Sequence, residues 1–527
     1  MGSAERKDLK FSMVISSFQS SFQRHVPSVK FFRLTASNLL YLFSSSYTTK
    51  TPTNLEYLTG IMSSSISSES HKGSLYSTKT SSSDNSLEEP ENKTGKSTDD
   101  SSKLRLFMGI LKKFVGVADI ATVRFSLPAQ LLEPTPNLEY WNYIDQPSVF
   151  AAIGLSNDPV ERMLEVLRFW FTKDLKYVKG KPCKPYNSTL GEFFRCNWEV
   201  NNEIPTIAEL KKIGEGSRSS SRSKFSRNSS TSTTVSKSFS ISPISDKIKV
   251  SFLTEQTSHH PPVSAFIVDC PERGLQARGF DQITAKFTGM SVKVSPGEHN
   301  FGFYITLKDR DDEEYHLTHP TAHIGGLIRG NLNVTVCEQC YITCKKTQIK
   351  TILHYVEESW LGKSQNKVEG VIFKYNPSND VIMKIKDVPE SDILGRISGA
   401  WKETVYFSLG SSNKHRIPLV DLTPLYPAEK IVPPMTFQLP NESRRQWYPV
   451  TEAIDERQYS KATSLKLELE EKQRMKVKER EQKDTKWTPR FFVGALTPEG
   501  RPELTSEGKE VLLHLQKNEW KLEEKID

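Results

Sequence analysis

The sequence predicts a mainly β protein with flanking helices (α+β), built on one large antiparallel sheet or barrel. Between residues 193 and 407, short runs rich in β-branched and aromatic residues follow one another without interspersed helical patterns. Many short strands joined by turns are typical of an antiparallel sheet or a barrel. Helical patterns stand on either side, at residues 104–115, 159–177 and 451–484. The length of 527 residues allows roughly three domains or one large all-β domain.

Two polar tracts are expected to lie outside any core. Residues 44–103 are dominated by Ser, Thr, Asn and charged side chains, which cannot bury enough apolar area to offset their ordering entropy. We therefore expect residues 1–102 to form a disordered Ser-rich leader. Residues 214–245 have the same character, with basic residues placed before serines. This second tract is expected to be a disordered Ser/Arg insert, either a tolerated surface loop or a phosphorylation target.

Charge and hydropathy exclude several classes of protein. Lys and Arg number 71 and Asp and Glu 63, which gives a net charge of +8. This surplus favours anionic surfaces but lacks the dense basic stripe of a nucleic-acid binder, so no nucleic-acid partner is expected. No stretch reaches 18 uninterrupted apolar residues, so we expect no transmembrane helix. Six cysteines without a secretory leader are typical of a reducing compartment and indicate thiols.

Each element has its own signal. In residues 104–115, Phe107, Leu111 and Phe114 recur at helical spacing with lysines on the other side, which predicts a short basic amphipathic helix. Pro159, preceded by Asn157 or Asp158 as a cap, opens the next helix. A long polar helix is expected at 451–484. The expected strands are 193–200, 248–255, 263–268, 275–281, 283–294, 301–307, 327–336, 349–356, 368–375, 381–385 and 399–407.

The first candidate site follows an expected strand. Residues 255–262 read Glu-Gln-Thr-Ser-His-His-Pro-Pro. The two prolines keep the backbone extended, so His259 and His260 are presented at low conformational cost. At a turn, both imidazoles can converge on one anion. A structural turn is the alternative, and composition alone favours it.

Two further clusters could hold a phosphate. Lys184 and Asn187 offer a charge and neutral donors within four residues, although an ordinary turn explains them equally well. Lys466, Glu470 and Arg474 lie at i, i+4 and i+8 on the expected C-terminal helix, where Glu470 can orient both cations. Taken alone, this spacing favours a salt-bridge ladder on a solvated helix.

Metal and catalytic sites are not expected. The three cysteines in residues 337–344 lack the second pair of a tetrahedral zinc site, and the three histidines in residues 316–323 are irregularly spaced. The chain contains no G-x-S-x-G motif, no P-loop and no dinucleotide fingerprint. Glu255 could act as an acid/base with His259 or His260, but no nucleophile accompanies them. We therefore expect no enzyme, no cofactor and no metal.

Residues 255–262 resemble the signature of the oxysterol-binding protein related lipid-transfer family. The match extends in order over residues 104–516, and residues 127–134 with Tyr140 and Trp141 resemble short fungal members. No pleckstrin or ankyrin module is apparent upstream. The further matching segments are 184–187, 190–192, 286–289, 291–294, Trp360 with Gly362, 471–474 and 487–492.

The resemblance implies an architecture and a function. It implies a near-complete antiparallel β-barrel around an apolar tunnel, with an N-terminal helical lid and long C-terminal helices. The lipid-binding domain would span 103–517, with a lid at 103–135 that carries Phe107, Leu111 and Phe114, and a tail at 518–527. It implies a carrier that extracts a sterol and exchanges it for phosphatidylinositol 4-phosphate between membranes. The phosphoinositide head group would meet Lys184, Asn187, His259, His260, Lys466, Glu470 and Arg474.

The resemblance also implies a cytoplasmic monomer that binds peripherally to anionic membranes of the endoplasmic reticulum, Golgi or plasma membrane. The identity of the second lipid stays open. Residues 126–132 depart from the longer aliphatic pattern of phosphatidylserine carriers, which favours a sterol, but phosphatidylserine or another phospholipid is an alternative. A sensor or scaffold that binds a sterol or phosphoinositide and acts through a partner is a further alternative, which the Ser-rich leader and insert would serve.

Overall fold

The computed structural model describes residues 109–118, 132–179, 184–201, 204–216, 247–326, 333–357, 365–412 and 415–524. The predicted leader, Phe107 and residues 217–245 of the predicted insert lie outside this part of the chain. Residues 214–216, at the start of that insert, instead close a helix.

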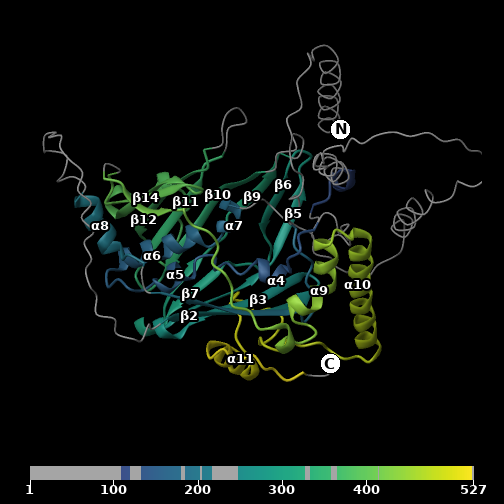
Figure 1. The fold of residues 1–527 in the computed structure, drawn as a ribbon. Helices are drawn as coiled ribbons and strands as arrows, with labels where there is room; N and C mark the ends of the chain where they lie inside the picture. The colour runs from purple at the N-terminus through teal and green to yellow at the C-terminus, as the bar shows by residue number, and fades with distance from the viewer. Residues whose placement is uncertain are drawn as a thin grey trace, which may run out of the picture.

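Fifteen strands of the described chain form a single antiparallel sheet (Figure 1). Its main path runs β1-β2-β3-β4-β7-β8-β10-β11-β12-β13-β14-β15, while β5, β6 and β9 form a branch that joins β10. The strands are β1 (Phe193–Val200), β2 (Ile248–His259), β3 (Pro262–Cys270), β4 (Leu275–Asp281), β5 (Ile283–Phe287), β6 (Val292–Pro296), β7 (Phe303–Leu307), β8 (Glu313–Leu317), β9 (Thr321–Gly325), β10 (Asn333–Cys344), β11 (Ile349–Tyr355), β12 (Lys367–Lys374), β13 (Ile393–Ala400), β14 (Thr404–Leu409) and β15 (Ile417–Asp421).

The predicted barrel is not closed. β1 and β15 stand at the two ends of the strand order and do not pair within the described chain. Instead, Asn197 in β1 exchanges backbone hydrogen bonds of 2.9 and 2.8 Å with Ile431, which lies beyond β15. Residues 422–434, which follow β15 and include Ile431, contain four prolines. Because proline cannot donate to a β-ladder, this segment covers the edge of β1 at one point and does not extend the sheet.

Some predicted elements differ in detail from the structure. The expected run 283–294 is a hairpin, β5–β6, whose turn is closed by Thr288 N donating to Ser291 O over 2.9 Å. The expected strand 381–385 is wrong, because its residues pair with no strand and Val381 is exposed. Strands β8, β9 and β15, each of five residues, were not expected. Most of β13 was not expected either, because the predicted strand 399–407 covers only its last two residues.

The helices flank the sheet. Asp158 accepts hydrogen bonds from Val160 N and Glu161 N, which confirms the predicted cap of α6. The expected helix at 451–484 is two helices, separated at Arg457 where φ is +60°. The helices are α4 (Asn137–Tyr140), α5 (Pro147–Ala151), α6 (Pro159–Thr172), α7 (Leu175–Lys179), α8 (Ile207–Gly216), α9 (Ser443–Asp455), α10 (Tyr459–Gln482) and α11 (Ser506–Gln516).

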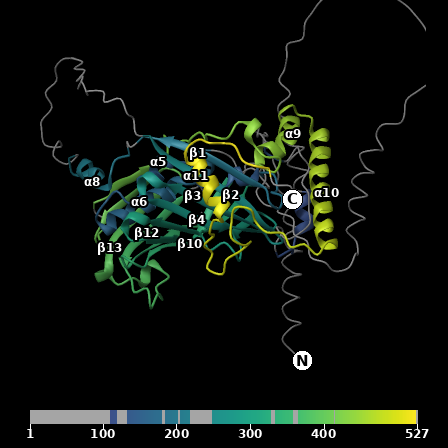
Figure 2. The same ribbon diagram turned by 90° about the horizontal axis from the view of Figure 1, so that it is seen from below.

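The main core lies where α5 and α6 pack into the curve of the sheet (Figure 1). Phe150 and Phe169 from these helices meet Phe303 and other inward side chains of the strands. α9 and α10 stand together at one side of the molecule, and α11 lies against β1 and β2 (Figure 2). Within the described residues, no helix combines the length and the apolar character needed to cross a bilayer.

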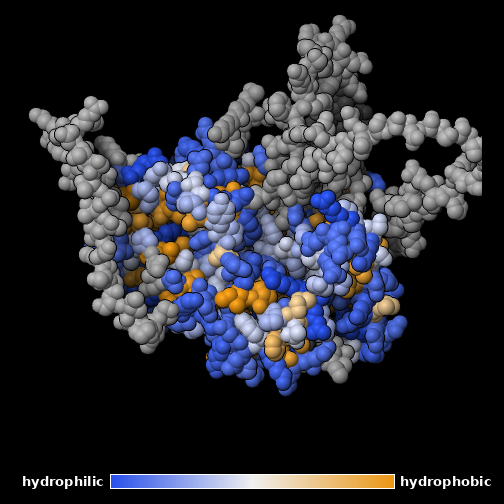
Figure 3. All heavy atoms as spheres, in the orientation of Figure 1, coloured by the Kyte–Doolittle hydropathy of each residue, from blue (hydrophilic) through white to orange (hydrophobic). Residues whose placement is uncertain are grey.

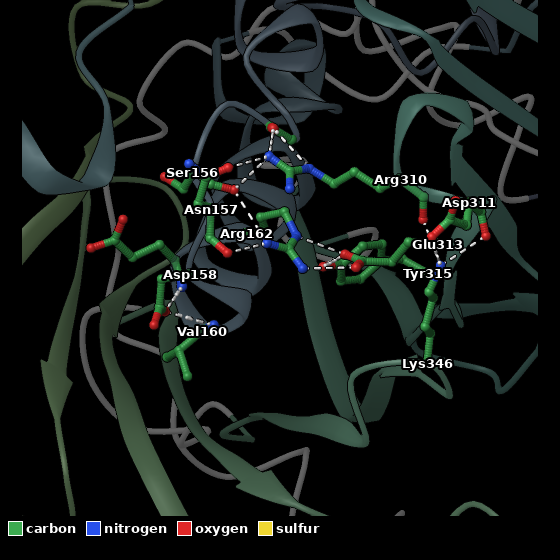
Figure 4. A network of polar contacts seen from close by, with 12 residues as sticks. Ser156, Asn157, Asp158, Val160, Arg162, Arg310, Asp311, Glu313, Tyr315 and Lys346 are labelled. Carbon is green, nitrogen blue, oxygen red and sulfur yellow. Dashed lines mark hydrogen bonds and ion pairs between the residues drawn. The ribbon is translucent and has the colours of Figure 1, made fainter.

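A buried ion pair fixes α6 against the sheet (Figure 4). Arg162 on α6 donates to both oxygens of Glu313 on β8, with Nε–Oε1 at 2.8 Å and Nη2–Oε2 at 2.7 Å. The Tyr315 hydroxyl donates to the same carboxylate over 2.7 Å. Nearby, Arg310 donates to the carbonyl oxygen of Gly154. Since a buried charge without its partner is costly, this network specifies where α6 enters the curve of the sheet.

Replacement of Arg162 tests this. Arg162→Met leaves the Glu313 carboxylate buried without its cation, so we expect the free energy of unfolding, measured by urea denaturation, to fall by about 3–5 kcal/mol. Arg501→Met is the matched control, because Arg501 pairs with Glu314 on the same strand in a more exposed position. It should cost about 1 kcal/mol or less. Equal losses in the two variants would contradict a special role for the buried pair.

Candidate functional site

A partly open cavity of about 160 Å³ lies between the helices and the branch of the sheet. Seven aromatic residues and the apolar side chains of β5, β6, β9 and β10 form most of its wall. The face of the molecule in Figure 3 is mainly hydrophilic with several apolar patches, whereas the wall of the cavity is mostly apolar. Such a lining suits the hydrocarbon of a ligand. The aromatic residues are Trp141, Tyr143, Trp170, Phe171, Tyr177, Tyr355 and Trp401.

A small group of polar side chains also lines this cavity. The ammonium group of Lys173 pairs with Asp174 and lies 4.6 Å from the centre of the Trp170 ring. The hydroxyl of Tyr143 hydrogen-bonds to Asp281. His319 completes the group. The cavity therefore combines an apolar wall with a localised set of donors and acceptors.

Burial sets the charge state of this group. It would raise the pKa of Asp174, but Lys173 and Lys176 outweigh it and hold that pKa at about 2. Burial raises the pKa of Asp281 to about 6, although Tyr143 donates to it. Burial and the nearby Lys173 lower the pKa of His319 to about 3, so its imidazole is neutral. At neutral pH, Asp281 is mainly an acceptor.

A second apolar cluster, here called the lid cluster, lies beside the cavity. Residues 109–111 and the 3-10 turn η1 (Lys112–Phe114) bury Leu111 and Phe114 in it and leave Lys112 exposed. Its partly buried members Val294 and Trp141 also line the cavity. Leu111 and Phe114 thus lie where a lid is expected, and the lid role stays a prediction. The cluster consists of Ile110, Leu111, Phe114, Leu132, Tyr186, Ala285, Phe287, Val292, Ile324, Trp447, Val450, Ala453, Ile454 and Ala462.

Two of the predicted phosphate-binding groups border the lid cluster. Tyr186 belongs to the cluster and stacks on Trp447 at 4.7 Å between ring centres. Beside it, buried Lys184 donates to Asn187 Oδ1 over 2.5 Å. Leu465 on α10 packs against the same cluster. The residues 184–187 and the start of α10 therefore border one apolar patch.

The predicted ladder on α10 exists. Lys466 Nζ donates to Glu470 Oε1 over 2.7 Å, and Arg474 Nη2 lies 3.8 Å from Glu470 Oε2. Lys466 is buried, whereas Arg474 is partly exposed and also donates to Glu471. Burial of Lys466 distinguishes this arrangement from a ladder on a fully solvated helix face.

The histidine pair lies at a second hollow, further along α10. The rings of His259 and His260 are 4.8 Å apart at the end of β2. They line a hollow of about 480 Å³ together with Leu190 and with Arg480 from the last turns of α10. Leu190 follows shortly after Asn187 in the chain. The histidine pair therefore lies near the end of α10, whereas Lys466 lies in its first half. A common role of the three groups in binding stays a prediction.

The two acidic residues of the motifs have structural partners. Glu255 accepts hydrogen bonds from Arg490 N and Phe491 N, each over 2.8 Å. Glu192 accepts from Ser443 Oγ on α9 over 2.7 Å and from Trp447 Nε1 over 3.1 Å. With both oxygens engaged by backbone amides, Glu255 acts as a cap for residues 490–491. This use argues against the hypothesis that Glu255 serves as an acid/base.

Several cavity residues were missed from the sequence. Lys173 and Asp174 interrupt an otherwise apolar helix end, which is a signal that could have identified them. His319 was considered only as a metal ligand. In the described chain, no three His, Cys, Asp or Glu side chains gather to hold a metal, and His316 instead stacks on Tyr304.

Comparison with known proteins adds a family model and close relatives. Residues 106–524 match the model described as "Oxysterol-binding protein". The chain is similar to oxysterol-binding protein-like protein 1 of Schizosaccharomyces pombe, with 44% identity over 470 residues, which cover 78% of this chain and 90% of that relative.

Two solved structures are similar in fold. The ORD domain of Osh1 in complex with cholesterol has a TM-score of 0.53 at 19% identity and covers 80% of this chain and 90% of that chain. The ORD of Osh3 from Saccharomyces cerevisiae, in complex with PI(4)P, has a TM-score of 0.51 at 17% identity and covers 78% and 93%. At these identities, the likeness concerns the fold alone.

The buried carboxyl of Glu192 gives a pH dependence that can be measured. Burial, opposed by its hydrogen bonds, raises the pKa of Glu192 from 4.5 to about 7. Between these values the native state keeps a proton that the unfolded chain has released. Stability contributed by that proton is therefore lost as the pH rises from about 5 to about 8, by an amount on the order of 3 kcal/mol.

Glu192→Gln, which resembles the protonated side chain, should remove that share of the slope in the free energy of unfolding against pH. Glu199→Gln, at a partly exposed position on β1, is the control and should keep the wild-type slope. If both variants kept the full slope, the assignment to Glu192 would be wrong.

Proposed function

The chain belongs to the oxysterol-binding protein family, and from that premise we propose that it extracts a sterol from one membrane and exchanges it for phosphatidylinositol 4-phosphate at another. The observation that carries the proposal is an apolar cavity that shares wall residues with the lid cluster. Residues 184–187 and the start of α10 border that cluster and form a basic rim. Support comes from similar folds whose solved complexes hold cholesterol and PI(4)P.

The cavity suits the transport of a sterol. Hydrocarbon exposed to water costs about 25 cal/mol per Å², so transfer through water needs an apolar container. The aromatic wall supplies it, and the Tyr143–Asp281 pair offers acceptor oxygens for one hydroxyl group. A flat apolar molecule with a single hydroxyl would place its polar end at this pair and its hydrocarbon against Trp141 and Trp401.

The rim suits a phosphorylated head group. Lys184 and Lys466 are buried cations whose polar neighbours include Asn187 and Glu470, respectively. A phosphate that replaces those neighbours gains charge-assisted hydrogen bonds to groups already fixed in place. The imidazoles of His259 and His260, together with Arg474, extend the same donor set along α10. Glu470 keeps the cations oriented while no phosphate is bound.

Exchange follows if both lipids use one cavity. The acyl chains of a phosphoinositide bound at the rim would enter the same apolar space as a sterol, so the two ligands exclude each other. A concentration gradient of one lipid can then drive the other against its own gradient. Closing Leu111 and Phe114 over the loaded cavity would keep the hydrocarbon from water during transit.

Replacement of the histidine pair separates the two ligands. In His259→Ala/His260→Ala, we expect phosphatidylinositol 4-phosphate binding to weaken at least about a hundredfold, since hydrogen bonds to a charged group contribute about 1.5–3 kcal/mol each. Sterol binding should be almost unchanged. Both affinities can be measured with fluorescent lipid analogues. His415→Ala/His514→Ala, which alters one histidine before β15 and one on α11, is the control and should affect neither ligand.

Equal weakening of both ligands by the double replacement would mean that the pair is structural. Liposome transfer then distinguishes a carrier from a sensor. A carrier accelerates movement of sterol between two vesicle populations, and phosphatidylinositol 4-phosphate in the acceptor should increase the rate. A sensor would bind lipid at stoichiometry and move it no faster than spontaneous exchange. Mass spectrometry of lipids that co-purify with the full chain identifies the second ligand, including phosphatidylserine.

A further inference from the structure

Residues 109–118, here called the lid segment, have a basic outer face that carries an exposed apolar residue. Leu111 and Phe114 are buried in the lid cluster, so they cannot reach a membrane while the segment is seated. Lys112 and Lys113 point outward, and Val115, which follows them, is 63% exposed. The seated segment therefore presents a different set of side chains from those expected to cover the cavity.

The β5–β6 hairpin presents a second exposed apolar residue. Its turn is closed tightly, since Ser291 N also donates to Thr288 Oγ1 over 3.2 Å and the two hydroxyls lie 2.9 Å apart. Gly289 at φ +87° allows the reversal. Met290 at the tip is 58% exposed although it belongs to a well-ordered turn. Exposure of a large apolar side chain to water costs free energy, and a partner that covers Met290 would remove that cost.

These two features lie on one rim. Phe287 and Val292, which flank the turn, belong to the lid cluster with Leu111 and Phe114. The turn therefore emerges directly beside the lid segment. In Figure 1, β5 and β6 reach the same side of the molecule as the dark segment that precedes α4.

The charges carried by these two segments have one sign. In residues 109–118 and 283–296, the ionisable side chains are Lys112, Lys113, Lys286 and Lys293, and no acidic residue occurs. Lys293 pairs with Glu338. In the described chain no ion pair involves the other three, and all three are exposed. Apolar tips among unneutralised lysines match the chemistry of an anionic lipid surface.

We propose that Met290 and Val115, with Lys112, Lys113 and Lys286, form a docking face for an anionic membrane that works while the lid segment is seated. This inference rests on the proposed lipid exchange and names the surface through which the loaded protein meets the bilayer. The lysines bind the surface charge, and Met290 enters the headgroup region. The cavity rim is thereby brought to the membrane before the segment moves.

Vesicle flotation of the full chain tests the docking face. The vesicles contain phosphatidylcholine with phosphatidylglycerol, an anionic lipid that is not a proposed cargo. Each lysine contributes about 1 kcal/mol at an anionic surface, or about fivefold in the partition coefficient. Lys112→Ser/Lys113→Ser/Lys286→Ser should therefore weaken partitioning on the order of a hundredfold, and added salt should weaken the wild type likewise.

The matched control removes the same net charge elsewhere. Lys509, Lys517 and Lys521 on and after α11 are also exposed, and their replacement by Ser should leave partitioning nearly unchanged. Met290→Gln should weaken it roughly fivefold, whereas Leu513→Gln on α11 should not. Hydrogen exchange of the wild-type chain with vesicles should show added protection at residues 109–118 and 286–292.

The outcomes separate this inference from the proposed function. Each variant is also loaded with sterol delivered by cyclodextrin without membranes, and bound lipid is counted by native mass spectrometry. Normal loading with lost flotation supports the docking face. Wild-type flotation of the lysine or Met290 variants, or an equal loss in the α11 controls, would overturn it, whether or not sterol is bound. Failure of all proteins to load sterol would contradict the proposed function alone.

Discussion

The buried carboxyl groups of Glu192 and Glu255 join the sheet to the α9–α10 unit, and the geometry of the basic rim depends on them. Glu192, just before β1, accepts hydrogen bonds from α9 at Ser443 and Trp447. Glu255, on β2, takes two backbone amides of the segment that follows α10. Both ends of the α9–α10 unit are therefore tied to neighbouring strands. α10 can then hold its cations beside the lid cluster, while His259 lies at the end of the same strand as Glu255.

Much of the sheet could be predicted because alternation reports burial directly. β1 was predicted at its observed bounds, and its side chains are mostly buried. Prediction failed where a turn does not interrupt the pattern, as in β5–β6, whose turn contains Met290 between two apolar strands. It also failed at residues 381–385, because Ile382 O accepts from Lys350 Nζ and this loop packs outside the sheet. Closure of a barrel depends on pairing between distant strands, which local sequence does not encode.

The site was predictable to a different degree at the rim and inside. The residues of the basic rim lie in short sequence motifs, so Lys184, His259 and Lys466 could be named as candidate phosphate-binding residues from local spacing. The polar group in the cavity depends on tertiary packing, since Asp281 ends β4 and His319 follows β8. Those positions meet only when the end of α6 enters the curve of the sheet. No spacing rule connects them, and their chemistry emerges from burial alone.

A shared wall connects ligand binding to the seating of the lid segment. Ile324 on β9 lines the cavity and is also a buried member of the lid cluster. Val294 contributes to both in the same way. A ligand that orders these strands stabilises the surface on which Leu111 and Phe114 pack, and an empty cavity removes that support. By the same coupling, a seated segment favours the filled cavity. Ligand loading and closure of the lid segment are then coupled, because the same apolar residues line the cavity and support the segment.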